Sequence, residues 1–267
     1  MLYGAASPIP GISGGTLFVF FNIYEDFFHS ASFANVKKNV PLLIAFLLGS
    51  AVGLLGISQV IMHLLTYYEQ IMYFSFIGLI LGCIPMIYKK TTVDKIKRTN
   101  VAIFIIALSF MIFLALMGGE VYTNVSLEQL GGVTPAIVTW VFIASFISAI
   151  AMLIPGVGGS IMMLAFGIYT IYIEALSTLD PLMISVLLIS MALGILAGIK
   201  IIKNMLVSRP QTLYGAILGF IIGSIFIVFP GFSMDLEGLL SIIFMVACTI
   251  LAYRLTKKTE VTENPNN

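Results

Sequence analysis

Charged side chains are scarce in this sequence, at 9% of its 267 residues, whereas 60% of the residues are hydrophobic. The mean hydropathy of +1.09 lies far outside the range of a soluble domain of this length. The alternating polarity of membrane-barrel strands is also absent, and uninterrupted apolar runs take its place. These absences exclude a soluble globular protein and favour an all-α polytopic membrane protein.

Groups that support catalysis or bind metals are few as well. The sequence holds two histidines and two cysteines, and Cys83 and Cys248 both lie within apolar runs. It has no metal-ligand spacing, no acid–base pair and no histidine–arginine constellation for phosphate hydrolysis. We therefore expect a protein that is not an enzyme, with no metal and no cofactor other than a coupling ion, H⁺ or Na⁺.

Seven apolar runs are long enough to form helices that cross a bilayer, which takes about 20 residues. They cover 40–63, 69–88, 101–117, 134–153, 181–202, 212–229 and 238–255. Two shorter runs, 16–28 and 161–175, would form helices of roughly 20 Å, too short for a hydrocarbon core of about 30 Å. We interpret these two runs as re-entrant half-helices.

The basic residues are confined to alternate loops. They lie at 37–38, 89–98, 200–209 and 254–258, whereas the loops between these regions carry acidic residues and no lysine or arginine. Positive residues are retained on the cytoplasmic side of membrane proteins. We therefore expect these four regions and the C-terminus to face the cytoplasm. The polar tail, 256–267, is expected to be disordered.

The two halves of the sequence match each other at an offset of 145 residues. Residues 10–16 align with 155–161, and Gly49 and Gly53 align with Gly194 and Gly198. After a four-residue deletion, Gln70, Tyr73, Gly78 and Gly82 align with Gln211, Tyr214, Gly219 and Gly223. Each half holds one glycine-motif hairpin and three further spans, so the halves must face opposite ways. This pattern predicts an inverted repeat.

We place the first repeat at 1–117, an external linker at 118–133 and the second repeat at 134–255. The second motif follows a full apolar run, 134–153, whereas only nine residues precede the first. The first repeat is therefore expected to lack an upstream arm, or its natural start lies upstream of Met1. The glycine pairs spaced four apart are interpreted as positions where helices pack closely.

The aligned motifs begin with Pro-Gly and cannot continue a helix, because proline lacks an N–H and glycine favours left-handed conformations. Thr16 and Ser160 would then open half-helices whose free N–H groups and positive dipole ends attract an anion. Lys200 and Arg209, on the predicted inner side, are either phosphate ligands or ordinary membrane anchors. The predicted substrate-binding residues are Ser13, Gly14, Gly15, Thr16, Gly158, Gly159, Ser160 and Arg209.

Glu25 breaks the similarity of the two halves, because it aligns with Thr170. An acid at such a position is either a site for the coupling ion, H⁺ or Na⁺, or an interfacial side chain at a helix end. We name Glu25 as the coupling-ion candidate.

Residues 4–24, with Pro-Gly-Ile-Ser-Gly-Gly-Thr and Asn-Ile-Tyr, together with 151–160 and Gly167-Ile-Tyr, resemble the PopT family of bacterial polyprenyl-phosphate translocases. The likeness covers almost the whole chain. It departs from the family pattern at Ser7, where aspartate is frequent, and at Gly158, where serine is frequent. The resemblance implies transport of undecaprenyl phosphate from the outer to the inner leaflet of the cytoplasmic membrane.

The residues alone leave three functions open. The first is a transporter of a lipid-linked phosphate working by alternating access, and the second is an ion-coupled transporter of a small soluble anion, which needs no lateral access for lipid. A membrane lipid phosphatase is the weakest. The expected partners are a polyprenyl-phosphate lipid, the membrane and a second copy in a homo-oligomer, with no nucleic acid.

Overall fold

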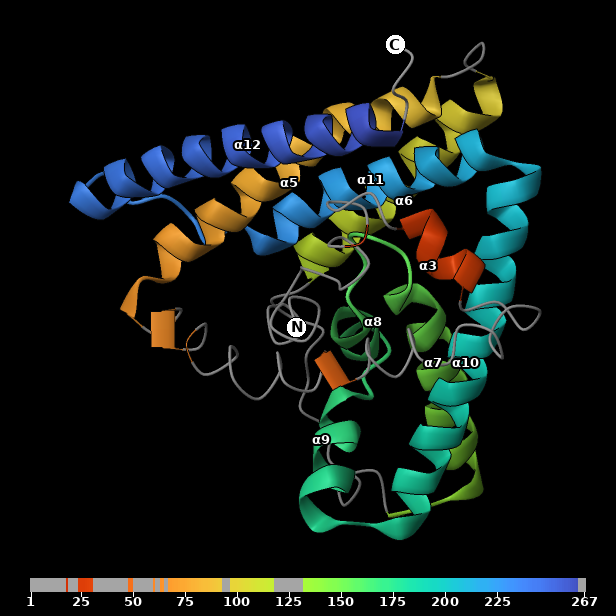
Figure 1. Cartoon of the computed structure of the whole chain (residues 1–267). Coiled ribbons are helices and arrows are strands. Elements are labelled where there is room, and N and C mark those ends of the chain that lie inside the picture. The colour runs from red at the N-terminus through yellow and green to blue at the C-terminus, as the bar shows by residue number, and fades with distance from the viewer. Residues whose placement is uncertain are drawn as a thin grey trace.

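The structure is a computed structural model, and it describes residues 18, 24–30, 48–49, 60, 63–64, 67–92, 97–117 and 132–263 (Figure 1). Within these ranges all regular structure is helical, and six helices are long and apolar enough to cross a membrane. They are α5 (Glu69–Thr91), α6 (Arg98–Met117), α7 (Pro135–Met152), α10 (Pro181–Ser208), α11 (Pro210–Val228) and α12 (Leu236–Glu263). Six predicted spans are thus confirmed. The seventh, 40–63, falls largely outside the described residues.

Three long helices begin at a proline, the residue whose missing N–H costs nothing in the first helical turn. These are α7, α10 and α11. The side chains of Thr134 and Asp180 complete two of these starts by accepting hydrogen bonds from backbone N–H groups of the first turn. Helix α10 ends at Ser208, directly before Arg209 and Pro210, so two long helices meet there with one residue between them.

The short helices are α3 (Tyr24–Ser30), α8 (Gly159–Ala165) and α9 (Tyr169–Thr178). The prediction of one continuous half-helix over 161–175 is wrong, because the chain breaks between α8 and α9. Gly167 has φ +69°, the Gly167 N–H donates to the carbonyl of Leu164, and the Ile168 N–H donates to that of Met163. This pattern of hydrogen bonds around a left-handed glycine ends a helix.

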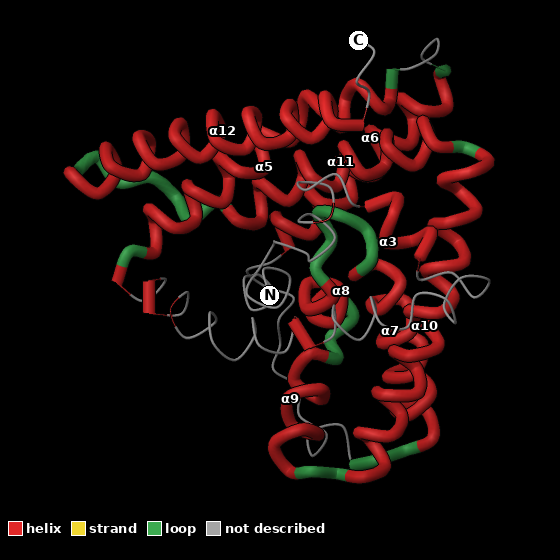
Figure 2. The backbone as a smooth tube through the Cα atoms, in the orientation of Figure 1, coloured by secondary structure: helices red, strands yellow, loops and turns green. Residues whose placement is uncertain are grey.

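The long helices form two groups. Helices α5, α11 and α12 run across the upper part of Figure 1 together with α6, while α7 and α10 run side by side down one edge, next to α8 and α9. Short loops join most of the described helices (Figure 2). Helix α3 lies where the groups meet, and its Phe28 is buried in one core cluster with Ile87, Ile202 and Ile217. This junction positions the candidate site described below.

Glycines line the closest helix contacts. A Cβ atom at Gly78 or Gly82 of α5 would overlap the backbone of α12, and one at Gly219 of α11 would overlap the backbone of α6. At Gly223 a Cβ would overlap the side chain of Met111 on α6. Gly194 and Gly198 face α7 in the same way. The interpretation of these six as packing positions is confirmed, whereas Gly53 lies outside the described residues.

The contacts also fix the helix directions. Along α5 and α12, Gly78 faces Met245 and Gly82 faces Ala252, so these helices run parallel. Along α6 and α11, Gly215 approaches Asn100, and successive glycines meet successive turns, so this pair is parallel too. The end of α5 meets the start of α11 through a contact between Lys90 and Tyr214. The basic ends of α5, α6, α10, α11 and α12 therefore gather at one end of this helix group.

Helix α12 extends further than expected. Residues 256–263 are helical, which contradicts the prediction that the tail is disordered from Thr256 onward. Thr256 is buried, and its hydroxyl donates to the carbonyls of Ala252 and Tyr253, so it sits inside the helix and does not end it.

Candidate functional site

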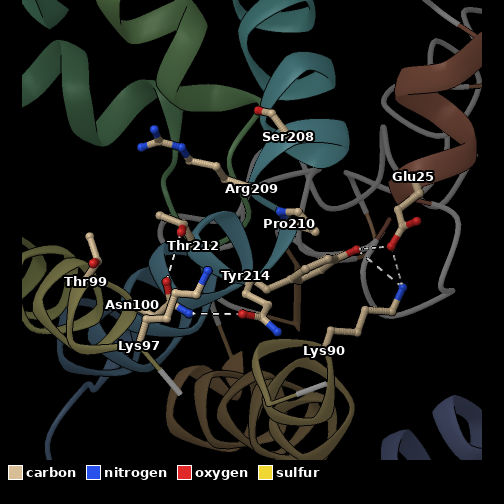
Figure 3. Close-up of a pocket in the computed structure, with 11 residues that line it drawn as sticks. Glu25, Lys90, Lys97, Thr99, Asn100, Ser208, Arg209, Pro210, Thr212 and Tyr214 are labelled. Carbon is tan, nitrogen blue, oxygen red and sulfur yellow. Dashed lines mark hydrogen bonds and ion pairs between the residues drawn. The ribbon is translucent and has the colours of Figure 1, made fainter. Parts of the chain in front are cut away.

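A polar cavity of about 690 Å³ lies at the basic end of the described helices (Figure 3). Its walls come from α3, the end of α5, the start of α6, and the junction of α10 and α11. It is lined by Glu25, Lys90, Lys97, Thr99, Asn100, Ser208, Arg209, Pro210, Gln211, Thr212 and Tyr214. In a chain with so few charges, four charged side chains around one cavity mark it as the candidate site.

One side of the cavity is a closed cluster of three side chains. The Lys90 Nζ lies 2.9 Å from Glu25 Oε1, and the Tyr214 hydroxyl donates to the same oxygen at 2.5 Å. Lys90 also lies 5.2 Å from the centre of the Tyr214 ring, in a cation–π contact. Figure 3 shows the three side chains pointing toward one another. The carboxylate is thus neutralised by a residue more than sixty positions away in sequence.

Partial burial raises the pKa of Glu25, but the hydrogen bond from Tyr214 and the hydrogen bond and charge of Lys90 lower it further, so its net pKa lies below the usual value. Glu25 therefore carries a full negative charge near neutral pH. In this conformation its carboxylate is occupied by Lys90 and Tyr214. A proton or Na⁺ would have to compete with both of them.

The opposite side holds the cations that remain for a ligand. Arg209 and Lys97 make no side-chain hydrogen bond or salt bridge within the described part of the chain, and Figure 3 shows Arg209 pointing away from Glu25. Between these two sides, the Thr212 hydroxyl donates to Asn100 Oδ1 at 2.9 Å, and Asn100 Nδ2 donates to Gln211 Oε1 at 3.4 Å. The Nε2 of Gln211 is buried without a partner among the described residues. The side chains of Arg209, Lys97 and Gln211 therefore have hydrogen-bond donors for a ligand.

The local sequence explains the position of Arg209. A residue before proline is pushed out of the helical region, and Arg209 has φ −147° and ψ 57°. The chain therefore turns at this residue, which brings it to the cavity wall between the end of α10 and the start of α11. Gln211, Thr212 and Tyr214 follow in the first turns of α11.

The second glycine motif forms a tight turn against α11. The Val157 N–H donates to the carbonyl of Ile154 at 3.2 Å, and Gly156 at the third position has φ +88°. Proline followed by a left-handed glycine is typical of a type II turn. A Cβ on Gly156 would also overlap the backbone at Phe220 and Ile221, midway along α11. Glycine is required here by conformation and by packing.

The predicted residues of the second motif do not line the cavity. Gly158 precedes α8, and Gly159 and exposed Ser160 begin it. Within the described residues, the N–H groups of Gly159, Ser160 and Ile161 have no hydrogen-bond partner. A Cβ on Gly159 would lie 3.3 Å from the side chain of Met152, a tight contact. The first motif, with Ser13, Gly14, Gly15 and Thr16, lies outside the described residues.

Helix α3 connects the cavity to the second motif. The hydroxyl of buried Tyr24 donates to the carbonyl of Leu153 at 3.4 Å, directly before the turn, and the adjacent Glu25 lines the cavity. The structure thus brings together two predicted site residues, Glu25 and Arg209. Sequence reasoning missed Lys90 and Tyr214, the partners of Glu25, although Tyr214 stood among the positions shared by the two halves.

Comparison with known proteins identifies the family. The model of the VCA0040-like family, described as undecaprenyl phosphate translocase-like, matches residues 3–239. The chain belongs to this family. The resemblance predicted from the glycine motifs is thereby confirmed. The family match includes α3, both sides of the cavity and the second motif, so the site lies within the part that the family shares.

A curated relative gives a second comparison. The polyprenyl-phosphate transporter of Staphylococcus aureus (strain NCTC 8325 / PS 47) is 29% identical over 244 residues, which cover 87% of this chain and 85% of that protein. No solved structure matches the chain. Within the described residues, no group of three histidine, cysteine, aspartate or glutamate side chains is placed to hold a metal ion.

Proposed function

We propose that the protein returns undecaprenyl phosphate from the outer to the inner leaflet of the bacterial cytoplasmic membrane by alternating access. The observation that carries the proposal is the cationic cavity at the end of a set of apolar helices, where Arg209 and Lys97 have no anionic partner among the described residues. A phosphate is an anion that guanidinium and ammonium donors suit. Membership of the translocase-like family supports the same substrate.

The packing supports an inverted repeat. The predicted repeat equates α5 with α11 and α6 with α12. Gly78 and Gly82 of α5 contact α12, and their equivalents Gly219 and Gly223 of α11 contact α6. Equivalent glycines thus make equivalent contacts in the two halves, as a pseudo-two-fold axis between α5 and α11 requires. If the two halves exchanged their conformations, an inward-open state would become an outward-open one.

The charge distribution supports the orientation. The basic residues near the ends of α5 and α12 and at the starts of α6 and α11 lie at one end of their helix group. Positive residues favour the cytoplasmic side, so this end and the C-terminus would face the cytoplasm. The polar cavity would then be the inner-leaflet end of the transport path.

The second motif supports a re-entrant hairpin. Its turn packs against the middle of α11, and the Trp140 Nε1 donates to the carbonyl of Phe166 at 3.2 Å, so α8 returns toward the start of α7. A phosphate held at the half-helix N-termini remains a prediction. Helix α8 has only seven residues, so its dipole is small, and the cavity supplies the stronger attraction.

For the driving force, we propose that Glu25 binds the coupling ion, H⁺ or Na⁺, in a conformation where α3 has separated from Lys90. In the conformation described, Lys90 occupies the carboxylate as an internal cation. Competition between Lys90 and an external cation would connect ion binding to movement of α3.

Reconstitution tests the function directly. In liposomes that carry labelled undecaprenyl phosphate in one leaflet, the label should distribute equally between the two leaflets faster with the protein than without it. Replacing Arg209 and Lys97 together with glutamine should slow this at least tenfold, because two charge-assisted contacts contribute about 1.5 to 3 kcal/mol each. The matched control is Lys200→Gln, which removes a charge on α10 outside the cavity. Equal rates with and without wild-type protein would refute the function.

A further inference from the structure

A second, smaller cavity lies beside the polar one, between α5, α6 and α11. Its volume is about 170 Å³, and its surface is almost wholly apolar. Tyr88 and Thr91 come from α5, Val101 and Phe104 from α6, and Leu218 from α11. We call it the apolar groove.

The groove is apolar although threonine and asparagine line it. The hydroxyls of Thr91 and Thr92 donate back to the carbonyl of Tyr88, at 2.5 and 3.1 Å, which leaves their methyl groups as the surface available to a ligand. Asn100 lines both cavities, and its amide is held by Thr212 and Gln211 of the polar cavity. Asn100 therefore separates a cationic compartment from an apolar one.

The rim of the groove faces outward. Tyr88 is 53% exposed and Val101 is 45% exposed, although both lie on helices apolar enough to span a membrane. Ile105, one turn along α6 from Val101, continues this exposed apolar face. On a membrane helix such a face contacts lipid chains. The groove thus opens toward lipid, whereas its inner end meets the polar cavity.

We propose that the apolar groove binds the first part of the prenyl chain of a polyprenyl phosphate whose phosphate lies in the polar cavity. The inference rests on the proposed function and deepens it. The two compartments meet at one residue, Asn100, so a single amphipathic ligand with an anionic head fits both. A soluble anion would use the polar cavity alone. The groove therefore specifies a lipid-linked substrate and the gap between α5 and α6 as its entry.

The test uses the purified full-length protein and measures affinity for farnesyl phosphate, with farnesol as the uncharged comparison. Val101→Trp fills the mouth of the groove and should weaken binding of farnesyl phosphate about tenfold, the effect of losing two buried methylene-sized contacts. Ile105→Trp is the matched control, because it adds the same side chain one turn away, outside the groove. It should leave the affinity unchanged.

The outcomes separate the groove from the proposed function. If the wild type prefers farnesyl phosphate to farnesol but Val101→Trp and Ile105→Trp bind it equally, the groove assignment is wrong and the function stands. If the wild type shows no preference for the phosphate, both are wrong.

A second measurement needs no variant. Wild-type protein is irradiated with a prenyl phosphate that carries a diazirine on its first isoprene unit. The adduct should map to peptides that contain Tyr88 or Val101. Adducts confined to other helices would overturn the proposal.

Discussion

The cluster of Glu25, Lys90 and Tyr214 gives the sharpest test of the site geometry. Tyr214→Phe keeps the buried ring and its cation–π contact with Lys90 but removes the hydroxyl, which donates to Glu25 at 2.5 Å and accepts from Lys90 at 3.4 Å. A hydrogen bond to a charged group contributes about 1.5 to 3 kcal/mol. Because the Glu25 side chain is 53% exposed, solvent screens this bond, and we expect a loss of about 1 kcal/mol in the free energy of unfolding.

The pH dependence of this loss follows from the direction of the pKa shift. The pKa of Glu25 is lower in the folded protein than its ordinary value of 4.5, so the stabilisation is fully present above about pH 4.5. It disappears as the pH falls through the lowered pKa and the carboxylate is protonated. The difference between wild type and Tyr214→Phe should therefore be larger at pH 7 than at about pH 3.

The assay is unfolding of the detergent-solubilised protein at both pH values. Tyr73→Phe is the matched control, because Tyr73 is the equivalent of Tyr214 in the other half and its hydroxyl has no hydrogen-bond partner among the described residues. We expect its effect to stay within about 0.5 kcal/mol. Equal losses for both variants, or a loss for Tyr214→Phe that is the same at both pH values, would refute the reasoning.

Two further predictions concern the second motif and the orientation. Gly156→Ala should destabilise the protein by more than about 2 kcal/mol and by more than Gly167→Ala, in unfolding measurements, because both glycines have positive φ but only Gly156 also meets the backbone of α11. A cysteine at Ser177 should react with an impermeant maleimide added to intact cells, whereas one at Thr92 should not; the reverse labelling would disprove the topology.

The long helices were predictable from the sequence because their signals are local. Apolar runs of sufficient length and prolines at Pro135, Pro181 and Pro210 define where the helices lie and begin. The break at Gly167 was missed because residues 161–175 are apolar throughout, and apolar content does not distinguish one helix from two. The helical conformation of 256–263 was not predicted, because a polar and charged segment is typical of disorder.

The candidate site was predictable only in part. Glu25 and Arg209 were singled out by a break in the repeat and by loop charge, and the cavity contains both. The contacts of Glu25 with Lys90 and Tyr214 depend on how α3, α5 and α11 pack. The sequence does not show this packing, because the three residues lie far apart along the chain. The apolar groove was invisible for the same reason. The groove is apolar because the hydroxyls of Thr91 and Thr92 donate to the carbonyl of Tyr88, and the amino-acid composition does not indicate these hydrogen bonds.

The matched glycine contacts bear on the energy of the transport cycle. The interface that Gly78 and Gly82 of α5 form with α12 is equivalent to the one that Gly219 and Gly223 of α11 form with α6. If the halves exchange conformations, the contacts that one interface loses form at the other. The two end states should therefore have nearly equal free energies. A carrier built in this way has little intrinsic direction, and the gradients across the membrane would decide which way the lipid moves.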